Sequence, residues 1–176
     1  MIIIKRYGGY NLSELELVGK GTQGSVYKID PKRCIKVFKK KDSCKKEIKT
    51  LLMAQGDRHF AKIFESGENF IIREYIDGIE LDKYLKDHPL DINITKKILE
   101  IYDTLGRVGY RRQDIMLFHI LVTKKGTFRI IDTGRVMKEK RTYPKLILEG
   151  LEELDYKDKF LELVKLLRPD LYNKWI

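Results

Sequence analysis

The sequence predicts an α+β fold, in which a five-stranded antiparallel sheet with one helix is followed by a short, mainly helical part. Two observations predict it. Short apolar runs separated by turn residues fill the first seventy-odd positions. Apolar residues then recur at helical spacing through much of the remaining chain. Because no repeat or low-complexity linker separates the two parts, the 176 residues are expected to form a single domain.

The strands of the first part are predicted from apolar runs and the turns between them. Glycine-rich residues join the first two runs, which are expected to pair as a hairpin. A single helix is predicted after the third strand, because Asp42 or Ser43 can cap it and Ile48, Leu51 and Leu52 follow helical spacing. The five strands are expected at residues 15–20, 25–30, 33–38, 61–65 and 69–75.

The second part is predicted to contain three helices and a hairpin. The turn Lys124, Lys125 and Gly126 separates the two strands of the hairpin, at residues 120–123 and 127–131. A short helix is expected at residues 81–85. A longer helix has the apolar stripe Ile94, Ile98, Ile101 and Leu105 and is ended by Gly106 and Gly109. A terminal helix carries Phe160, Leu163, Val164 and Leu167 and is ended by Arg168 and Pro169.

The composition favours a folded, reduced cytoplasmic protein. Apolar residues make up 43% of the chain, which argues against disorder. Cys34 and Cys44 show neither CxxC spacing nor paired histidines, so neither a zinc site nor a disulfide framework is indicated. No segment approaches the roughly 18 apolar residues of a membrane span. The net charge of +10 favours an acidic or polyanionic partner, although the lysine-rich residues 36–49 are also consistent with a solvated helix face.

The glycine-rich segment is a candidate nucleotide site. Residues 19–26 read G-K-G-T-Q-G-S-V, and missing side chains let backbone amides approach phosphate oxygens. By itself this spacing fits a glycine-rich hairpin without function equally well, and dinucleotide-binding folds have a similar spacing. In those folds the glycines open a helix, whereas residues 25–29 are strand-like here. The phosphates would therefore be covered by a hairpin.

Lys36 interrupts the apolar third strand and is a candidate phosphate ligand. An ammonium that faces inward from such a strand needs an anion. Glu47, eleven residues later on the predicted helix, could hold Lys36 while the ammonium meets nucleotide phosphates. The alternative is that Lys36 is one more surface lysine and Glu47 a solvated helix charge.

A third cluster decides between these interpretations. It consists of Arg112-Gln113-Asp114, then His119-Ile120-Leu121-Val122, and then Asp132-Thr133-Gly134. In order and spacing the cluster resembles the protein-kinase-like superfamily, whose His-Arg-Asp loop, with Asn five residues later, precedes a hairpin and Asp-Phe-Gly. Residues 73–78 resemble the hinge between kinase lobes. The resemblance covers residues from about 17 to 134 and is closest in build to small atypical kinases of the RIO and lipopolysaccharide-kinase type.

The resemblance implies a two-lobed fold with ATP between the lobes. The lobes would be residues 1–75 and 80–176, joined by a hinge at 76–79. Asp114 would be catalytic by orienting or deprotonating the acceptor hydroxyl, and Lys36 by neutralising phosphate charge. Asp132 would ligate magnesium, and His119 stands at the second metal position. ATP contacts are implied for Val18, Gly19, Gly21, Gly24, Val26, Lys36, Glu47, Glu74 and Ile76.

Several positions depart from the family pattern. His119 replaces an Asn, and since imidazole suits magnesium less well than an oxygen ligand, we expect weaker metal binding or a shift toward manganese. Arg112 replaces a His and Thr133 a Phe, both in mainly packing roles. Arg73 stands where the family keeps an apolar residue behind the adenine, so it would either salt-bridge outward or narrow the pocket. After Gly134 the chain is too short for a full activation segment.

The expected function is an ATP-dependent phosphotransferase of the serine/threonine-kinase type. It would use ATP with magnesium, or manganese, and transfer the γ-phosphoryl group to a hydroxyl of a protein or small molecule. The alternative is a pseudokinase, which would act as a nucleotide-binding or regulatory module without transfer. A third hypothesis is a basic nucleic-acid-binding domain, for which no zinc-finger spacing or base-stacking platform is visible.

Overall fold

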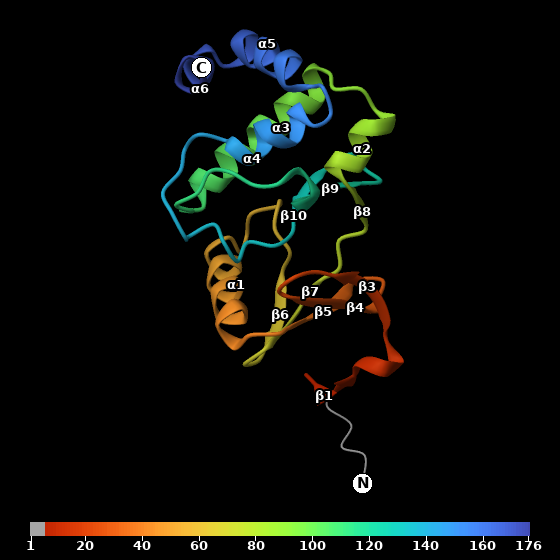
Figure 1. Cartoon of the computed structure of the whole chain (residues 1–176). Coiled ribbons are helices and arrows are strands. Elements are labelled where there is room, and N and C mark those ends of the chain that lie inside the picture. Colours follow the sequence, from red (N-terminus) through yellow and green to blue (C-terminus); the bar gives the residue numbers. More distant parts are fainter. Residues whose placement is uncertain (1–5) are drawn as a thin grey trace. The chain divides into compact units, whose positions relative to one another are not determined.

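The computed structural model describes residues 6–176 and has an α+β architecture (Figure 1). In this range it contains six α-helices and a five-stranded antiparallel sheet, so the predicted class and the predicted sheet are confirmed. The internal contacts divide the chain into two compact units. The first ends at Ile76 and also includes Asp132–Arg135, and the second comprises Asp77–Ile131 and Val136–Ile176.

The sheet of the first unit has the strand order β3-β4-β5-β7-β6. Its register places Val26 opposite Lys36, and Lys36 opposite Ile71. Because directly opposed residues share a face of a sheet, these three side chains project from the same face. The strands are β3 (Glu16–Lys20), β4 (Gly24–Asp30), β5 (Arg33–Phe38), β6 (Ile63–Ser66) and β7 (Phe70–Glu74).

The fourth strand of the sheet begins at Ile63, two residues after its predicted start. Ala61 lies outside the ladder because its carbonyl accepts the side-chain Nε2–H of Gln55 at 2.9 Å. Strand β6 therefore starts at Ile63, whose N–H is bound by the Gln55 side-chain oxygen at 3.1 Å. The side chain of one polar residue sets the strand boundary, which apolar alternation could not predict.

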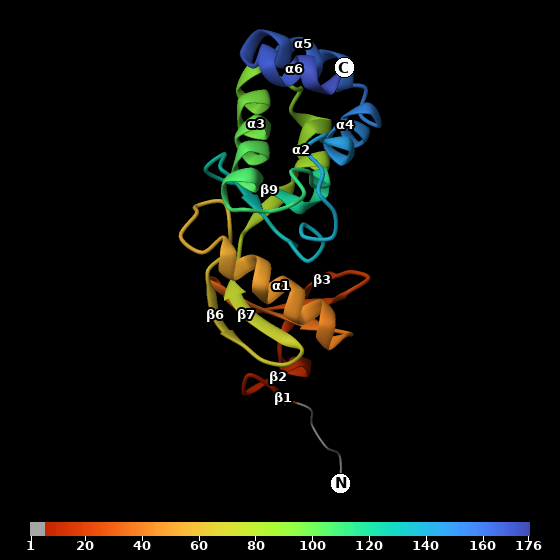
Figure 2. The ribbon, with the colours of Figure 1, turned by 90° about the vertical axis from the view of Figure 1, so that its left-hand side faces the viewer.

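Helix α1 (Lys41–Met53) packs against one face of this sheet (Figure 2). The predicted caps are wrong, since the N-cap is Lys40, which makes no side-chain cap bond. Asp42 lies in the first turn instead, where a negative charge is favourable to the helix dipole. Leu52 is 58% exposed and does not face the core. The core between helix and sheet consists of Phe38, Cys44, Leu51 and Ile71.

An N-terminal hairpin covers the other face of the sheet. Strands β1 (Arg6–Tyr7) and β2 (Tyr10–Asn11) form it, and the 3₁₀ helix η1 (Leu12–Glu14) follows. Gly8, at φ +54°, lies so close to Ile72 that a Cβ would be 2.8 Å from its Cδ1 atom. Since Ile72 alternates with Ile71, it points away from α1. This hairpin was not predicted from the sequence.

The second unit combines five helices with the three-stranded sheet β10-β9-β8. The predicted hairpin is confirmed as β9 (Ile120–Thr123) and β10 (Phe128–Ile130), and β8 (Gly78–Glu80) pairs with β9. The 3₁₀ helix η2 (Leu117–His119) precedes β9. The helices are α2 (Leu81–Asp87), α3 (Ile92–Arg107), α4 (Lys145–Glu152), α5 (Lys157–Leu167) and α6 (Pro169–Trp175).

The predicted apolar stripe of α3 forms the core of this unit, since Ile94, Ile98, Ile101 and Leu105 are all buried. Helices α5 and α6 lie beside one end of α3 (Figure 2). The ring of Trp175 contacts Tyr102 of α3 edge-on at 5.0 Å and stacks near Phe160 of α5 at 6.5 Å. None of the helices within residues 6–176 has the length and apolar character needed to cross a membrane.

Candidate functional site

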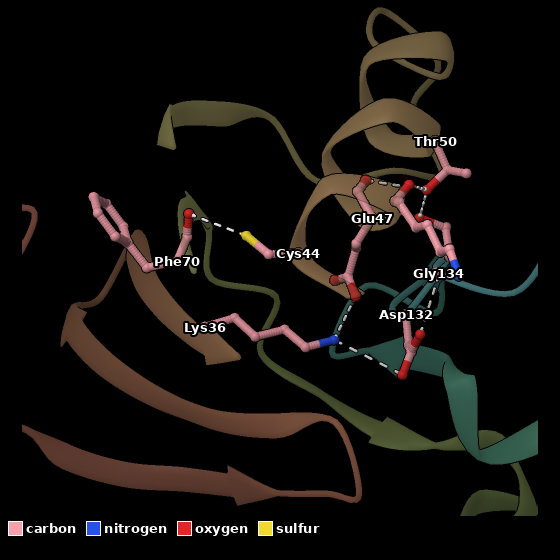
Figure 3. Close-up of polar contacts among 9 residues, drawn as sticks. Lys36, Cys44, Glu47, Thr50, Phe70, Asp132 and Gly134 are labelled. Atoms are coloured by element: carbon pink, nitrogen blue, oxygen red, sulfur yellow. Dashed lines mark hydrogen bonds and ion pairs between the residues drawn. The ribbon is translucent and has the colours of Figure 1, made fainter. Parts of the chain in front are cut away.

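Lys36 and Glu47 form a buried ion pair in the first unit. The Nζ atom of Lys36 lies 2.6 Å from Oε2 of Glu47, and their side chains are 8% and 1% exposed. The same ammonium lies 3.8 Å from Oδ2 of Asp132. Figure 3 shows Lys36 reaching from β5 toward both carboxylates. The structure therefore brings three predicted site residues together, and the alternative of a surface lysine and a solvated glutamate does not hold.

The electrostatics of this cluster leave Asp132 as its accessible acid. Burial raises the pKa of Glu47 above its ordinary value, the Lys36 ammonium opposes this shift, and Asp132 adds to it. Among the described residues Glu47 Oε1 has no hydrogen-bond partner, whereas the Asp132 side chain is 25% exposed. Glu47 thus binds Lys36 from the interior, whereas the partly exposed carboxylate of Asp132 can contact a ligand.

The backbone at Asp132 adopts a left-handed conformation, with φ +60°. Such a conformation costs about 1 kcal/mol or more outside glycine and persists where the surroundings fix it, often at functional sites. The N–H of Gly134 donates to Asp132 Oδ1 at 3.3 Å, which orients the carboxylate. Asp155, in the turn between α4 and α5, shares this φ, so the conformation alone does not identify a site.

Among the three glycines of the glycine-rich segment, Gly24 is the one that the packing of the chain itself requires. A Cβ there would lie 2.1 Å from the backbone oxygen of Val37. By contrast, a Cβ at Gly21 would meet no atom nearer than 3.9 Å, and at Gly19 none nearer than 3.8 Å. Neither residue has a positive φ. Since the fold explains the missing side chains at Gly19 and Gly21 by neither space nor conformation, close approach of a ligand remains a physical reason for them.

The predicted adenine-side residues lie in and after the sheet. Val18 occupies the irregularity between Leu17 and Gly19 and is 36% exposed, and Val26 pairs with Lys36. Ile76 is buried and is the last residue of the N-terminal stretch of the first unit. The backbone of Glu74 is already engaged, because its N–H donates to Lys62 O at 2.8 Å. Hinge contacts by Glu74 and Ile76 stay a prediction.

Arg73 does not salt-bridge outward. It is only 7% exposed, and its Nη1 atom donates to the carbonyl of Glu74 at 3.3 Å. Its charge also lowers the pKa of Glu47, in the same direction as Lys36. The guanidinium therefore adds positive charge to the interior near the ion pair.

Asp114 lies in the second unit with a fully buried side chain. Its carboxylate accepts the N–H of Leu146 at 3.0 and 2.9 Å and that of Ile147 at 3.2 Å, and Arg141 lies 3.8 Å away. Burial raises the pKa of Asp114, while the two N–H donors, Arg112 and Arg141 oppose the shift. The predicted base therefore caps the first turn of α4.

The chain after Gly134 runs along the loop that carries Asp114. The N–H of Arg112 donates to Val136 O at 2.9 Å, and the N–H of Gln113 donates to Arg141 O at 2.7 Å. Neither this pairing nor the helix α4 that follows it was predicted from the sequence. The spacing of Ile147, Leu148 and Leu151, which are buried in α4, is the signal that could have indicated the helix.

The metal site stays a prediction. Within residues 6–176 no group of three or more His, Cys, Asp or Glu could hold a metal ion by itself. Magnesium, however, often uses one or two carboxylates and takes its remaining ligands from water and substrate phosphates. The partly exposed carboxylate of Asp132 fits that donor set. His119 lies in the second unit, with its ring edge-on to Phe118 at 4.5 Å, and its role as a ligand stays a prediction.

Comparison with known proteins shows a partial similarity to a bacterial protein. The chain is 28% identical over 133 residues to a Bacillus subtilis (strain 168) protein named "Putative serine/threonine-protein kinase YrzF". The match covers 72% of this chain and 62% of the relative, so the chain spans less than two thirds of the relative's length. No protein-family model matches the chain. The match supports a kinase-like relationship.

Proposed function

We propose that this protein is an ATP-dependent phosphotransferase that transfers the γ-phosphoryl group to a hydroxyl acceptor, as serine/threonine kinases do. The observation that carries the proposal is the Lys36 ammonium, held in the interior by Glu47 and 3.8 Å from the accessible carboxylate of Asp132. A fixed cation beside an accessible carboxylate provides one group for phosphate oxygens and one for a divalent ion. The relative's printed name supports the same reaction class.

Each residue of the cluster has a distinct role in this proposal. Glu47 holds Lys36 so that its ammonium neutralises charge on the phosphates of ATP, and the low exposure of the pair limits screening by water. Gly19 and Gly21 let backbone amides approach the same phosphates. Asp132 would hold magnesium, which when bound neutralises charge on the transferring phosphoryl group. The acidic or polyanionic partner suggested by the net charge stays a prediction.

Asp114 carries the remaining role, positioning the acceptor hydroxyl. A general base must come within hydrogen-bond reach of the proton that it accepts. In this structure its carboxylate is buried and bound by the N–H groups of Leu146 and Ile147. For Asp114 to act on an acceptor, the first turn of α4 must separate from it.

The second candidate function is a nucleotide-binding module without transfer. The burial of Asp114 favours it, because a carboxylate that caps α4 serves the structure whether or not phosphoryl transfer takes place. The cluster around Lys36 is equally compatible with this candidate.

The two candidates differ in turnover and agree in nucleotide binding. ATP turnover and autophosphorylation are measured with magnesium and with manganese, and affinity for a non-hydrolysable ATP analogue is measured in the same buffers. The variant Lys36→Met should lose affinity, and Lys45→Met, at an exposed lysine of α1, serves as its matched control. Turnover that falls about 10²-fold or more in Asp114→Asn supports the phosphotransferase. Binding without turnover favours the module, and wild type that does not bind the analogue excludes both.

A further inference from the structure

Two threonine hydroxyl groups meet in the interior of the first unit. Thr50 Oγ1 on α1 and Thr133 Oγ1 on the segment after β10 are 2.7 Å apart, which is hydrogen-bond distance. The two residues are 2% and 0% exposed. The fully buried Thr133 fits the packing role expected at its position and also makes this polar contact.

The direction of this hydrogen bond follows from the other acceptors near Thr50. Its hydroxyl lies 3.1 Å from Lys46 O and 3.0 Å from Glu47 O, in the preceding turn of α1. A hydroxyl has a single hydrogen and two acceptor lone pairs. If Thr50 donates to its own helix, its oxygen accepts the hydrogen of Thr133, and both buried hydroxyl groups are satisfied.

The pair connects the two carboxylates that flank Lys36. Glu47 and Thr50 lie three residues apart on α1 (Figure 3). Asp132 directly precedes Thr133 in the sequence. Asp132 also has the left-handed backbone, a conformation that the surrounding structure must maintain. Fixing Thr133 on α1 therefore fixes the start of the Asp132–Gly134 turn relative to the helix that carries Glu47.

We propose that the Thr50–Thr133 hydroxyl pair positions Asp132 beside the Lys36–Glu47 ion pair and thereby sets how strongly a divalent metal supports nucleotide binding. This inference rests on the proposed nucleotide site. The pair touches neither metal nor phosphate and acts through the backbone of the Asp132–Gly134 turn. Both threonines are thus positioning residues.

The test uses variants that separate the hydroxyl group from the packing. Thr50→Val with Thr133→Val removes both hydroxyl groups and keeps both shapes, so stability should stay near that of wild type. Thr133→Ser keeps the hydroxyl and loses a buried methyl group, so the melting temperature should fall. The functional readout is the ratio of ATP-analogue affinity with magnesium to that without it. A second readout, which needs no nucleotide, is hydrogen exchange at the amides of Thr133 and Gly134.

The proposal predicts opposite patterns for these variants. The double valine variant should keep its melting temperature, lose about fivefold in the affinity ratio and exchange faster at residues 133 and 134. The serine variant should melt earlier and keep the ratio. An unchanged ratio in the double valine variant overturns the proposal. If wild type shows no dependence on magnesium, the proposed metal-nucleotide site fails, and the exchange rates then decide separately whether the pair fixes the turn.

Discussion

The backbone N–H of Leu146 lies 2.9 Å from Oδ2 of Asp114, so the residue predicted as the catalytic base caps a helix that sequence analysis did not predict. An amide at position 114 keeps only one oxygen acceptor for the N–H groups of Leu146 and Ile147. We therefore expect Asp114→Asn to lower the free energy of unfolding by about 1 kcal/mol at acidic pH, where the stability linked to this carboxyl group is greatest, measured by urea denaturation.

This cost should depend on pH with a defined sign. Because burial raises the folded pKa of Asp114 above the ordinary 3.8, the folded chain keeps this proton at pH values where the unfolded chain has lost it. Stability linked to Asp114 is therefore present at acidic pH and decreases as pH rises from 3.8 through the folded pKa. The stability difference between wild type and Asp114→Asn should narrow from acidic to neutral pH.

Asp30 provides a control of opposite sign. Its hydrogen bond with the Arg33 side chain lowers the pKa of Asp30, so the linked stability is present at neutral pH and is lost as pH falls. The difference between wild type and Asp30→Asn should therefore narrow toward acidic pH. A difference for Asp114→Asn that instead grows toward neutral pH would mean that the N–H donors outweigh burial at that carboxylate.

The Lys36–Glu47 pair should behave as a buried pair in stability measurements. Lys36→Met leaves a buried carboxylate without its cation and is expected to cost about 3 kcal/mol in urea unfolding. Lys36→Met combined with Glu47→Leu should recover most of that loss, because it removes both charges. Lys41→Met, which breaks the exposed pair with Glu68, should cause no measurable change. Equal stabilities of Lys36→Met and Lys41→Met would contradict the burial of the pair.

Alanine substitutions of two loop glycines should have separate effects, one on stability and the other on nucleotide affinity. Gly24→Ala places a methyl group against Val37 O and should destabilise the fold by about 2 kcal/mol. Gly21→Ala has room within the fold, so its melting temperature should match that of wild type, while its affinity for an ATP analogue should fall about tenfold. If Gly21→Ala binds the analogue as wild type does, phosphate approach does not explain this glycine.

The parts of the fold that were predicted are those with a local signal. The strands β3, β4 and β5 are bounded by turn residues, and the stripe on α3 follows a helical apolar spacing that marks its buried face. Helix α6 is not predicted because a proline after an apolar stripe indicates the end of a helix, whereas Pro169 occupies the first turn of the next one. The N-terminal hairpin has strands of only two residues, which are too short to show alternation.

The candidate site was predictable to the same extent. Spacing and resemblance indicated Lys36, Glu47 and Asp132, and the structure brings them together. The capping of α4 by Asp114 and the contact of Thr50 with Thr133 join residues 32 and 83 positions apart. Neither depends on a local pattern, so a single sequence carries no direct signal for them.

The proposed function depends most directly on Asp132, and calorimetric titration of a non-hydrolysable ATP analogue, with and without magnesium, tests that dependence. Wild type should bind the analogue about tenfold more tightly with magnesium, since a carboxylate beside phosphate needs a cation between them. Asp132→Asn should lose most of this gain and bind the metal-free analogue at least as tightly as wild type does, because the substitution removes a negative charge beside the phosphates. Equal affinity of wild type with and without magnesium, or an equal gain in Asp132→Asn, would contradict the proposed site.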